Sequence, residues 1–211
     1  MYARKGQLPI LIINLIALVL FSVHFLANAN YEFVLYVGVI TFFLIVFVLT
    51  NSKVYYPNGL LWALTVWALL HLSGGALYLN GERLYDIILI PLSDKLPIFR
   101  YDQLVHIFGF GAATALMFYV LKPLLRPGIE RFTALTIVIT AAGLGIGALN
   151  EIVEFITSVI VPESGVGGYL NTSLDLVADL IGAILAVGVI RVTDRKFFSK
   201  KYQPAAEKTG I

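Results

Sequence analysis

Residues Asn171–Ala183 read NTSLDLVADLIGA, and they open an otherwise apolar segment that is long enough to cross a membrane. Asp175 and Asp179 lie four residues apart in this stretch, so a helix would present both carboxylates on one face. A carboxylate inside a membrane helix is costly and is by default a functional-site hypothesis. The stretch therefore predicts a membrane helix that carries part of a polar site.

The rest of the composition also points to a membrane protein. Of 211 residues, 59% are hydrophobic and only 13% are charged, against about 25% charged in soluble domains. We predict an all-α, polytopic integral membrane bundle of six transmembrane helices, at about residues 8–27, 33–49, 60–79, 101–121, 132–161 and 172–190. The first of these is long enough to be a retained helix instead of a cleaved signal peptide.

The segments between and after these helices complete the expected domain. Residues 82–100 are too short and too charged to span, and Pro91 and Pro97 interrupt them. We expect an interfacial or re-entrant piece there. Residues 1–200 are expected to form a single six-helix membrane domain, and residues 201–211 a basic, disordered tail. Gly143 and Gly147 have the GxxxG spacing that allows close helix packing.

The distribution of Lys and Arg predicts the orientation. Six spans place twelve of the 15 basic residues on the side of both termini, and leave only Arg83, Lys95 and Arg100 on the other. We therefore expect a multi-pass protein of the cell (inner) membrane with both termini cytoplasmic.

Several classes of function are disfavoured by the sequence. The chain contains no cysteine, so it has no disulfide, thiolate metal site or cysteine nucleophile. Its basic residues flank membrane segments and form no nucleic-acid footprint. The sequence carries no nucleotide or flavin signal. It also lacks the Gly-x-Ser-x-Gly elbow and the HExxH motif, so neither a serine hydrolase nor a standard zinc protease is indicated.

Polar residues recur at the outer ends of four expected helices. Three helices each carry a pair on one face, and a fourth carries a single histidine; these residues are Asp102 and His106, Glu151 and Glu154, Asp175 and Asp179, and His71. The expected topology puts all of them in the outer half of the membrane. We predict that they line one cavity that opens to the extracytoplasmic side.

Carboxylate and imidazole groups from several helices resemble sites for a divalent cation. The predicted metal ligands are His71, His106, Glu151, Glu154 and Asp175, with Asp102 and Asp179 as further ligands or as the catalytic base. The donor set does not distinguish Zn, Mn, Mg or Fe. A proton-sharing network that includes Arg100, Tyr101 and Asn150 would satisfy the same groups without a metal. Asp102 and Asp175 could also be ordinary helix-start residues.

These motifs resemble two related groups of polytopic membrane proteins. One is the YjdF-like family of uncharacterised bacterial inner-membrane proteins, and the other is the VanZ-like family, named for a protein linked to teicoplanin resistance. The resemblance covers about residues 71–183 and rests on four motifs: His71-x-x-Gly74-Gly75, Tyr101-Asp102-x-x-x-His106, Glu151-x-x-Glu154-Phe155, and Thr172-x-x-Asp175-Leu176 followed by Gly182-Ala183.

The resemblance implies shared positions at Asp102, His106, Glu151 and Asp175. The chain departs from the VanZ-like pattern at Asp179, where Asn is more usual. It departs from the YjdF-like pattern at Phe155, where Trp is more usual, and at Asn171, where Asp is more usual. The resemblance supports a shared site and implies no established reaction.

Three functions stay open on the sequence. The leading hypothesis is a metal-dependent hydrolase or transferase that acts on a membrane lipid or lipid-linked envelope substrate. The second is a proton- or cation-coupled transporter whose carboxylates are the coupling site. The third is a non-catalytic membrane scaffold. The sequence does not predict an oligomeric state.

Overall fold

The computed structural model describes residues 4–125, 132–161 and 164–198. Its six long helices are α1 (Gln7–Ala27), α2 (Tyr31–Thr50), α3 (Asn58–Ala76), α4 (Tyr101–Leu121), α5 (Phe132–Ile160) and α6 (Tyr169–Thr193). All six are long and apolar enough to cross a membrane. The predicted all-α, six-helix membrane bundle is confirmed, and the predicted tail at 201–211 lies outside the described residues.

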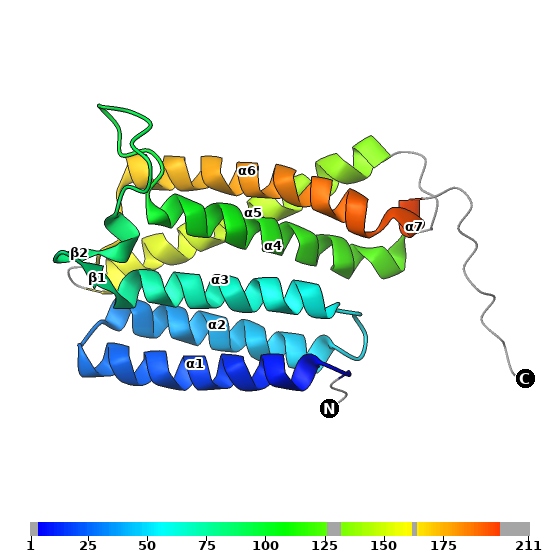
Figure 1. Ribbon diagram of the computed structural model, residues 1–211, viewed down its shortest axis with the longest axis horizontal. Coiled ribbons are helices and arrows are strands. Elements are labelled where there is room, and N and C mark those ends of the chain that lie inside the picture. Colours follow the sequence, from blue (N-terminus) through cyan, green and yellow to red (C-terminus); the bar gives the residue numbers. More distant parts are fainter. Residues whose placement is uncertain (1–3, 126–131, 162–163, 199–211) are drawn as a thin grey trace, which may run out of the picture.

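The helices run along one common direction in two groups. Figure 1 shows α1, α2 and α3 side by side, with α4, α5 and α6 against them. α4 packs on α3, α5 and α6, so it is the central helix of the bundle. One end of the bundle holds the N-terminus, the 3-10 turn η2 (Lys122–Leu124) and the short helix α7 (Arg195–Phe198).

The other end is covered by the segment between α3 and α4. Strands β1 (Tyr78–Leu79) and β2 (Glu82–Arg83) form an antiparallel hairpin. Asn80 and Gly81 connect them with φ of 55° and 85°, as a type I′ turn requires. The 3-10 turn η1 (Leu84–Asp86) follows, and Ile88 then pairs with Arg100. This placement at the end of the bundle fits an interfacial segment and not a re-entrant one.

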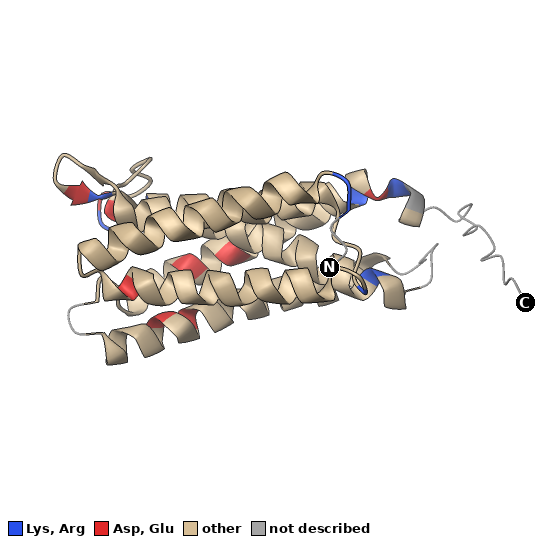
Figure 2. Cartoon of the chain, turned by 90° about the horizontal axis from the view of Figure 1, so that it is seen from below, with Lys and Arg blue, Asp and Glu red and all other residues tan. Residues whose placement is uncertain are grey.

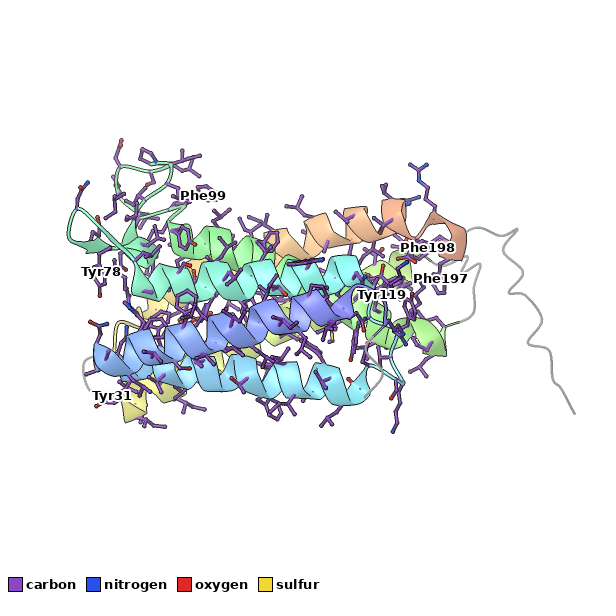
Figure 3. All side chains as sticks on the ribbon, turned by 60° about the horizontal axis from the view of Figure 1, so that its bottom comes forward. Tyr31, Tyr78, Phe99, Tyr119, Phe197 and Phe198 are labelled. Atoms are coloured by element: carbon purple, nitrogen blue, oxygen red, sulfur yellow. The ribbon has the colours of Figure 1, made fainter. Side chains whose placement is uncertain are left out.

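The surface is that of a protein embedded in lipid. Large apolar side chains on the helix flanks are exposed, such as Val19 and Leu20 on α1 and Ile184 on α6. Figure 2 shows the basic residues at the two ends of the bundle, whereas acidic residues also occur along the helices. Figure 3 shows Tyr31, Tyr78 and Phe99 toward one end and Tyr119, Phe197 and Phe198 toward the other. Aromatic residues favour these positions at membrane–water interfaces.

Glycines allow the helices around the site to approach closely. A Cβ on Gly182 of α6 would meet the Ile107 carbonyl and the Gly111 amide nitrogen of α4. On α5, a Cβ on Gly143 would meet Thr114, and one on Gly147 would meet the Asp179 carboxylate. The two GxxxG glycines therefore pack as predicted, and Gly147 also makes room for an acidic side chain.

Candidate functional site

The site is built where α4 and α6 present their paired polar residues to each other. His106 Nδ1 lies 2.9 Å from Oδ1 of Asp179, and His106 Nε2 lies 3.6 Å from Oδ1 of Asp102. His106 is 5% exposed and Asp179 is fully buried. The imidazole therefore lies between two carboxylates, one from its own helix and one from the neighbouring helix.

Two overlapping groups of potential metal ligands share this histidine. Asp102, His106 and Asp175 form the outer group, and His106, Glu151 and Asp179 form the inner group. In each group the three donor atoms lie within 4.8 Å of one another. Three helices thus converge on one buried site, which the helical spacing of these residues predicts.

The outer group has its hydrogen bonds satisfied by amide side chains. Gln103 Nε2 donates to Oδ1 of Asp175 at 2.8 Å, and Asn171 Nδ2 donates to its other oxygen. Asn171 also donates to Oδ2 of Asp102 at 3.2 Å. Sequence reasoning missed Gln103, although a glutamine three residues before His106 on the expected helix lies on nearly the same face.

The inner group is not satisfied in this way. Both oxygens of Glu151 and Oδ2 of Asp179 are buried and have no hydrogen-bond partner among the described residues. Thr172 and Asn150 lie near Glu151, but neither meets it in hydrogen-bonding geometry. Glu151 is 8% exposed and Asp179 is 0% exposed. Unpaired buried carboxylate oxygens are costly. The inner group therefore needs a partner that the described part of the chain does not supply.

His71 and Glu154, two of the predicted ligands, have other partners. The Tyr85 hydroxyl and His71 Nδ1 are 2.5 Å apart, and aromatic rings surround the imidazole, namely Phe33, Tyr36, Trp67 and Tyr85. Glu154 accepts a hydrogen bond from Asn150 at 2.8 Å. In the described part of the chain, neither residue belongs to a group of three potential ligands.

The Tyr85 hydroxyl and His71 Nδ1 share a hydrogen bond whose direction depends on the imidazole tautomer. Burial, together with the carboxylates of Asp102 and Glu154, raises the pKa of Tyr85 well above its ordinary value. Tyr85 therefore keeps its proton, and its hydroxyl remains neutral beside the imidazole. His71 Nδ1 thus has a hydrogen-bond partner that the chain itself supplies.

A cavity of about 60 Å³ leads from the hairpin end to the outer group. Charged groups from several elements line it, namely Glu32, Arg83, Asp86, Arg100, Asp102 and Glu154, and His71 and Asn171 line it too. A single water needs roughly 10–15 Å³ by a comparable measure. The cavity therefore has room for a few water molecules beside Asp102.

Arg83 ties together the elements at the mouth of this cavity. Its Nε lies 3.1 Å from Asp86, its Nη1 lies 3.8 Å from Glu32 on α2, and its Nη2 donates to the Gly165 carbonyl at 3.0 Å. Burial alone would lower the pKa of Arg83, but the neighbouring Asp86 and Glu32 carboxylates outweigh it and raise that pKa. The guanidinium therefore stays charged and joins the hairpin to α2 and to the segment before α6.

Toward the opposite end of the bundle the site has no charged continuation. Between His106 and Lys122 on α4, before Glu151 on α5, and between Asp179 and Arg191 on α6, the sequence has no acidic or basic residue. Glycine and alanine contacts between α4 and α6 fill this region. Within the residues that the structure describes, the charged groups of the site thus continue toward the hairpin end and not toward the opposite end.

Comparisons with known proteins give one match. A family model described as "Predicted membrane protein (DUF2238)" matches residues 8–196, which include every site residue named above. No curated protein matches the chain, and no solved structure matches it.

Proposed function

The chain belongs to the DUF2238 family of predicted membrane proteins, and we propose that it binds a divalent cation at His106, Glu151 and Asp179 and uses it in hydrolysis or group transfer on a lipid or lipid-linked envelope substrate. The observation that carries the proposal is the unpaired state of three buried carboxylate oxygens on Glu151 and Asp179. A cation would satisfy all three. The donor set of imidazole and carboxylates suits Zn, Mn or Fe, and Mg less well.

His106 is oriented for this role by the carboxylates on its two sides. Its Nδ1 faces Asp179 and its Nε2 faces Asp102. One of the two ring nitrogens would then be the ligand atom, while the other would keep its proton and face its own carboxylate. A carboxylate that fixes the tautomer of a ligating histidine is a common feature of metal sites.

The structure supports a different division of roles from the one that the sequence predicts. Asp179 belongs to the unsatisfied inner group, which favours it as a ligand. Asp175 is held by Gln103 and Asn171, which favours it as a positioning residue. Asp102 lines the cavity of about 60 Å³ and contacts His106. A water or a substrate could therefore reach this carboxylate, and Asp102 would be the catalytic base.

A bound divalent cation would supply Lewis-acid polarisation of the bond that is cleaved. The chain would contribute binding of the cation, orientation of His106, and a proton acceptor at Asp102. The apolar surroundings of α4, α5 and α6 exclude bulk water, which strengthens each electrostatic contact in the site. Only the polar head of a lipid substrate would need to enter the cavity.

The orientation of this site follows from the charge distribution, and it is part of the proposal. Both termini would be cytoplasmic, because the N-terminal end of the bundle carries most of the basic residues. The cavity would then open toward the outer leaflet of the cell (inner) membrane. Family membership also supports the YjdF-like resemblance, whereas the VanZ-like motifs stay a prediction.

A proton- or cation-coupled transporter is the second candidate, because unpaired buried carboxylates are also what a coupling site needs. The charged residues of the site continue toward the hairpin end alone in the described part of the chain, which favours an enzyme, since a transporter must carry its ion to both faces. A scaffold without ligand would leave Glu151 and Asp179 buried at a cost that nothing offsets.

Metal analysis of the purified protein tests the proposal. We expect one divalent cation per chain, and at least a tenfold weaker affinity in Glu151→Gln and Asp179→Asn. Glu154→Gln is the matched control, because Glu154 lies one turn away on α5 and has Asn150 as its partner. A protein without stoichiometric metal that shows pH-dependent cation flux in liposomes would instead be a transporter.

A further inference from the structure

A second cavity, of about 160 Å³, lies in the half of the bundle opposite the polar site. It is formed where α1, α2 and α3 meet α4, and most of its lining is apolar, including Ile10, Leu44, Phe47, Leu64, Trp67 and Phe110. It is roughly ten times larger than one water needs. Because its walls are helices long and apolar enough to cross a membrane, the medium around these walls is expected to be lipid hydrocarbon.

The polar side chains that line this cavity, called the groove below, already form hydrogen bonds within the protein. Asn14 Nδ2 donates to Thr65 Oγ1 at 2.7 Å. Gln7 Nε2 donates to the Tyr56 carbonyl at 3.2 Å, and the Asn51 amide donates to Gln7 Oε1 at 2.7 Å. The Gln7 bonds lie at the N-terminal end of the bundle, and the bond between Asn14 and Thr65 lies deeper in it. Because these polar groups are already paired, an occupant of the groove needs no polar group of its own. A hydrocarbon chain suits such a lining.

The charged residues near that end of the groove are basic. Arg4, Lys5 and Lys53 lie at the ends of α1 and α2, and the first 81 residues contain a single acidic residue, Glu32, at the far end of α2. The Arg4 guanidinium lies 4.1 Å over the Tyr55 ring. Its Nη1 is buried and has no hydrogen-bond partner among the described residues.

We propose that the groove binds one acyl chain of an anionic phospholipid, whose headgroup is held by Arg4, Lys5 and Lys53. The apolar lining accommodates the chain, and the three basic side chains have the charge opposite to that of the phosphate. This lipid belongs to the leaflet at the N-terminal end, so its site is separate from the cavity beside Asp102. The proposal is therefore independent of the proposed metal centre.

Fluorescence quenching by brominated lipid tests this site without altering the groove. The chain has two tryptophans, of which Trp67 lines the groove and Trp62 is 41% exposed on the same helix. In the Trp62→Phe variant, phosphatidylglycerol with brominated acyl chains should quench Trp67 strongly when it is a minor component in phosphatidylcholine. Brominated phosphatidylcholine as the minor component in phosphatidylglycerol should quench it much less.

Variants then separate the headgroup contribution from the chain contribution. Arg4→Gln and Lys53→Gln should each weaken phosphatidylglycerol binding about fivefold, while Lys95→Gln at the opposite end should not. Ala113→Leu would fill the groove and reduce quenching to the level set by the mole fraction of the lipid. Ala148→Leu, on an exposed face of α5, is its control.

Two results would overturn the proposal. Equal quenching of Trp67 by the two minor lipids would show that the groove has no preference for an anionic headgroup. Loss of binding in the charge variants, with no effect of a folded Ala113→Leu, would show binding at the surface only. If Ala113→Leu does not fold, the comparison of the two brominated lipids still decides.

Discussion

Asp179 is divided between two environments: its Oδ1 lies 2.9 Å from Nδ1 of His106, whereas its Oδ2 is buried without a hydrogen-bond partner in the described part of the chain. One oxygen is thus held by a neighbouring helix, and the other lies against Gly147, one turn before Glu151 on α5. The unpaired oxygen makes the inner group costly in the absence of a cation.

Removing the unpaired charge at Glu151 should stabilise the metal-free protein. We expect Glu151→Met to raise the free energy of unfolding by about 1–3 kcal/mol in chelator, because a buried carboxylate without partners is replaced by an apolar group. The same variant should lose the stabilisation that a divalent cation gives the wild type. Thermal unfolding with and without the cation measures both effects. Glu154→Met is the control. If it gave the same gain in unfolding free energy and the same loss of stabilisation by the cation, these effects would not be specific to the inner group.

The Gln103 amide should be essential to the outer group. Gln103→Leu removes the donor to Asp175 and leaves a fully buried carboxylate oxygen unpaired, at a cost of about 1–3 kcal/mol of stability. Asp175→Asn in the same background should cost less than in the wild type, because the two residues interact directly. A double-mutant cycle of unfolding free energies measures the coupling. Simple additivity would contradict the contact.

The approach of α4 to α6 predicts a contrast between two glycines. Gly182→Ala should destabilise the protein by about 1–3 kcal/mol, because its methyl group would meet backbone atoms of Ile107 and Gly111. Gly145→Ala should be neutral or stabilising by up to about 1 kcal/mol, because nothing lies within 4 Å of the added carbon. Unfolding of the two variants in detergent, side by side, measures the difference.

The absence of cysteine allows a clean test of orientation. Lys95→Cys, in the segment at the cavity end, should react with a membrane-impermeant maleimide in intact cells. Lys53→Cys, between α2 and α3, should react only after the membrane is opened. The reverse pattern of labelling would place the cavity on the cytoplasmic side and would exclude an outer-leaflet substrate.

The sequence predicted the six helices because long apolar segments have few alternatives in a membrane. It also predicted which residues share a helix face, because Asp102 with His106 and Asp175 with Asp179 keep helical spacing. The count of basic residues predicted which end of the bundle faces the cytoplasm, and this orientation stays a prediction. These features depend on local pattern, so one sequence is enough to derive them.

The sequence could not predict how each helix is rotated about its axis relative to its neighbours. His71 lies at the expected depth, yet it is enclosed by Phe33, Tyr36 and Trp67 and bonds to Tyr85. That rotation depends on close contacts such as Phe33 against Gly75, which arise only when α2 and α3 pack. Asn80-Gly81, by contrast, is a recognisable hairpin turn, and sequence reasoning passed over it.

The contact between Gly111 and Gly182 has a mechanical consequence. Backbone atoms approach closely there, so no rotamer change can relieve the contact, and α4 and α6 are held together directly through their main chains. The distance between His106 and Asp179 depends on this close approach. At the entrance, by contrast, the elements are joined through side chains, since Arg83 contacts Glu32 and the Gly165 carbonyl.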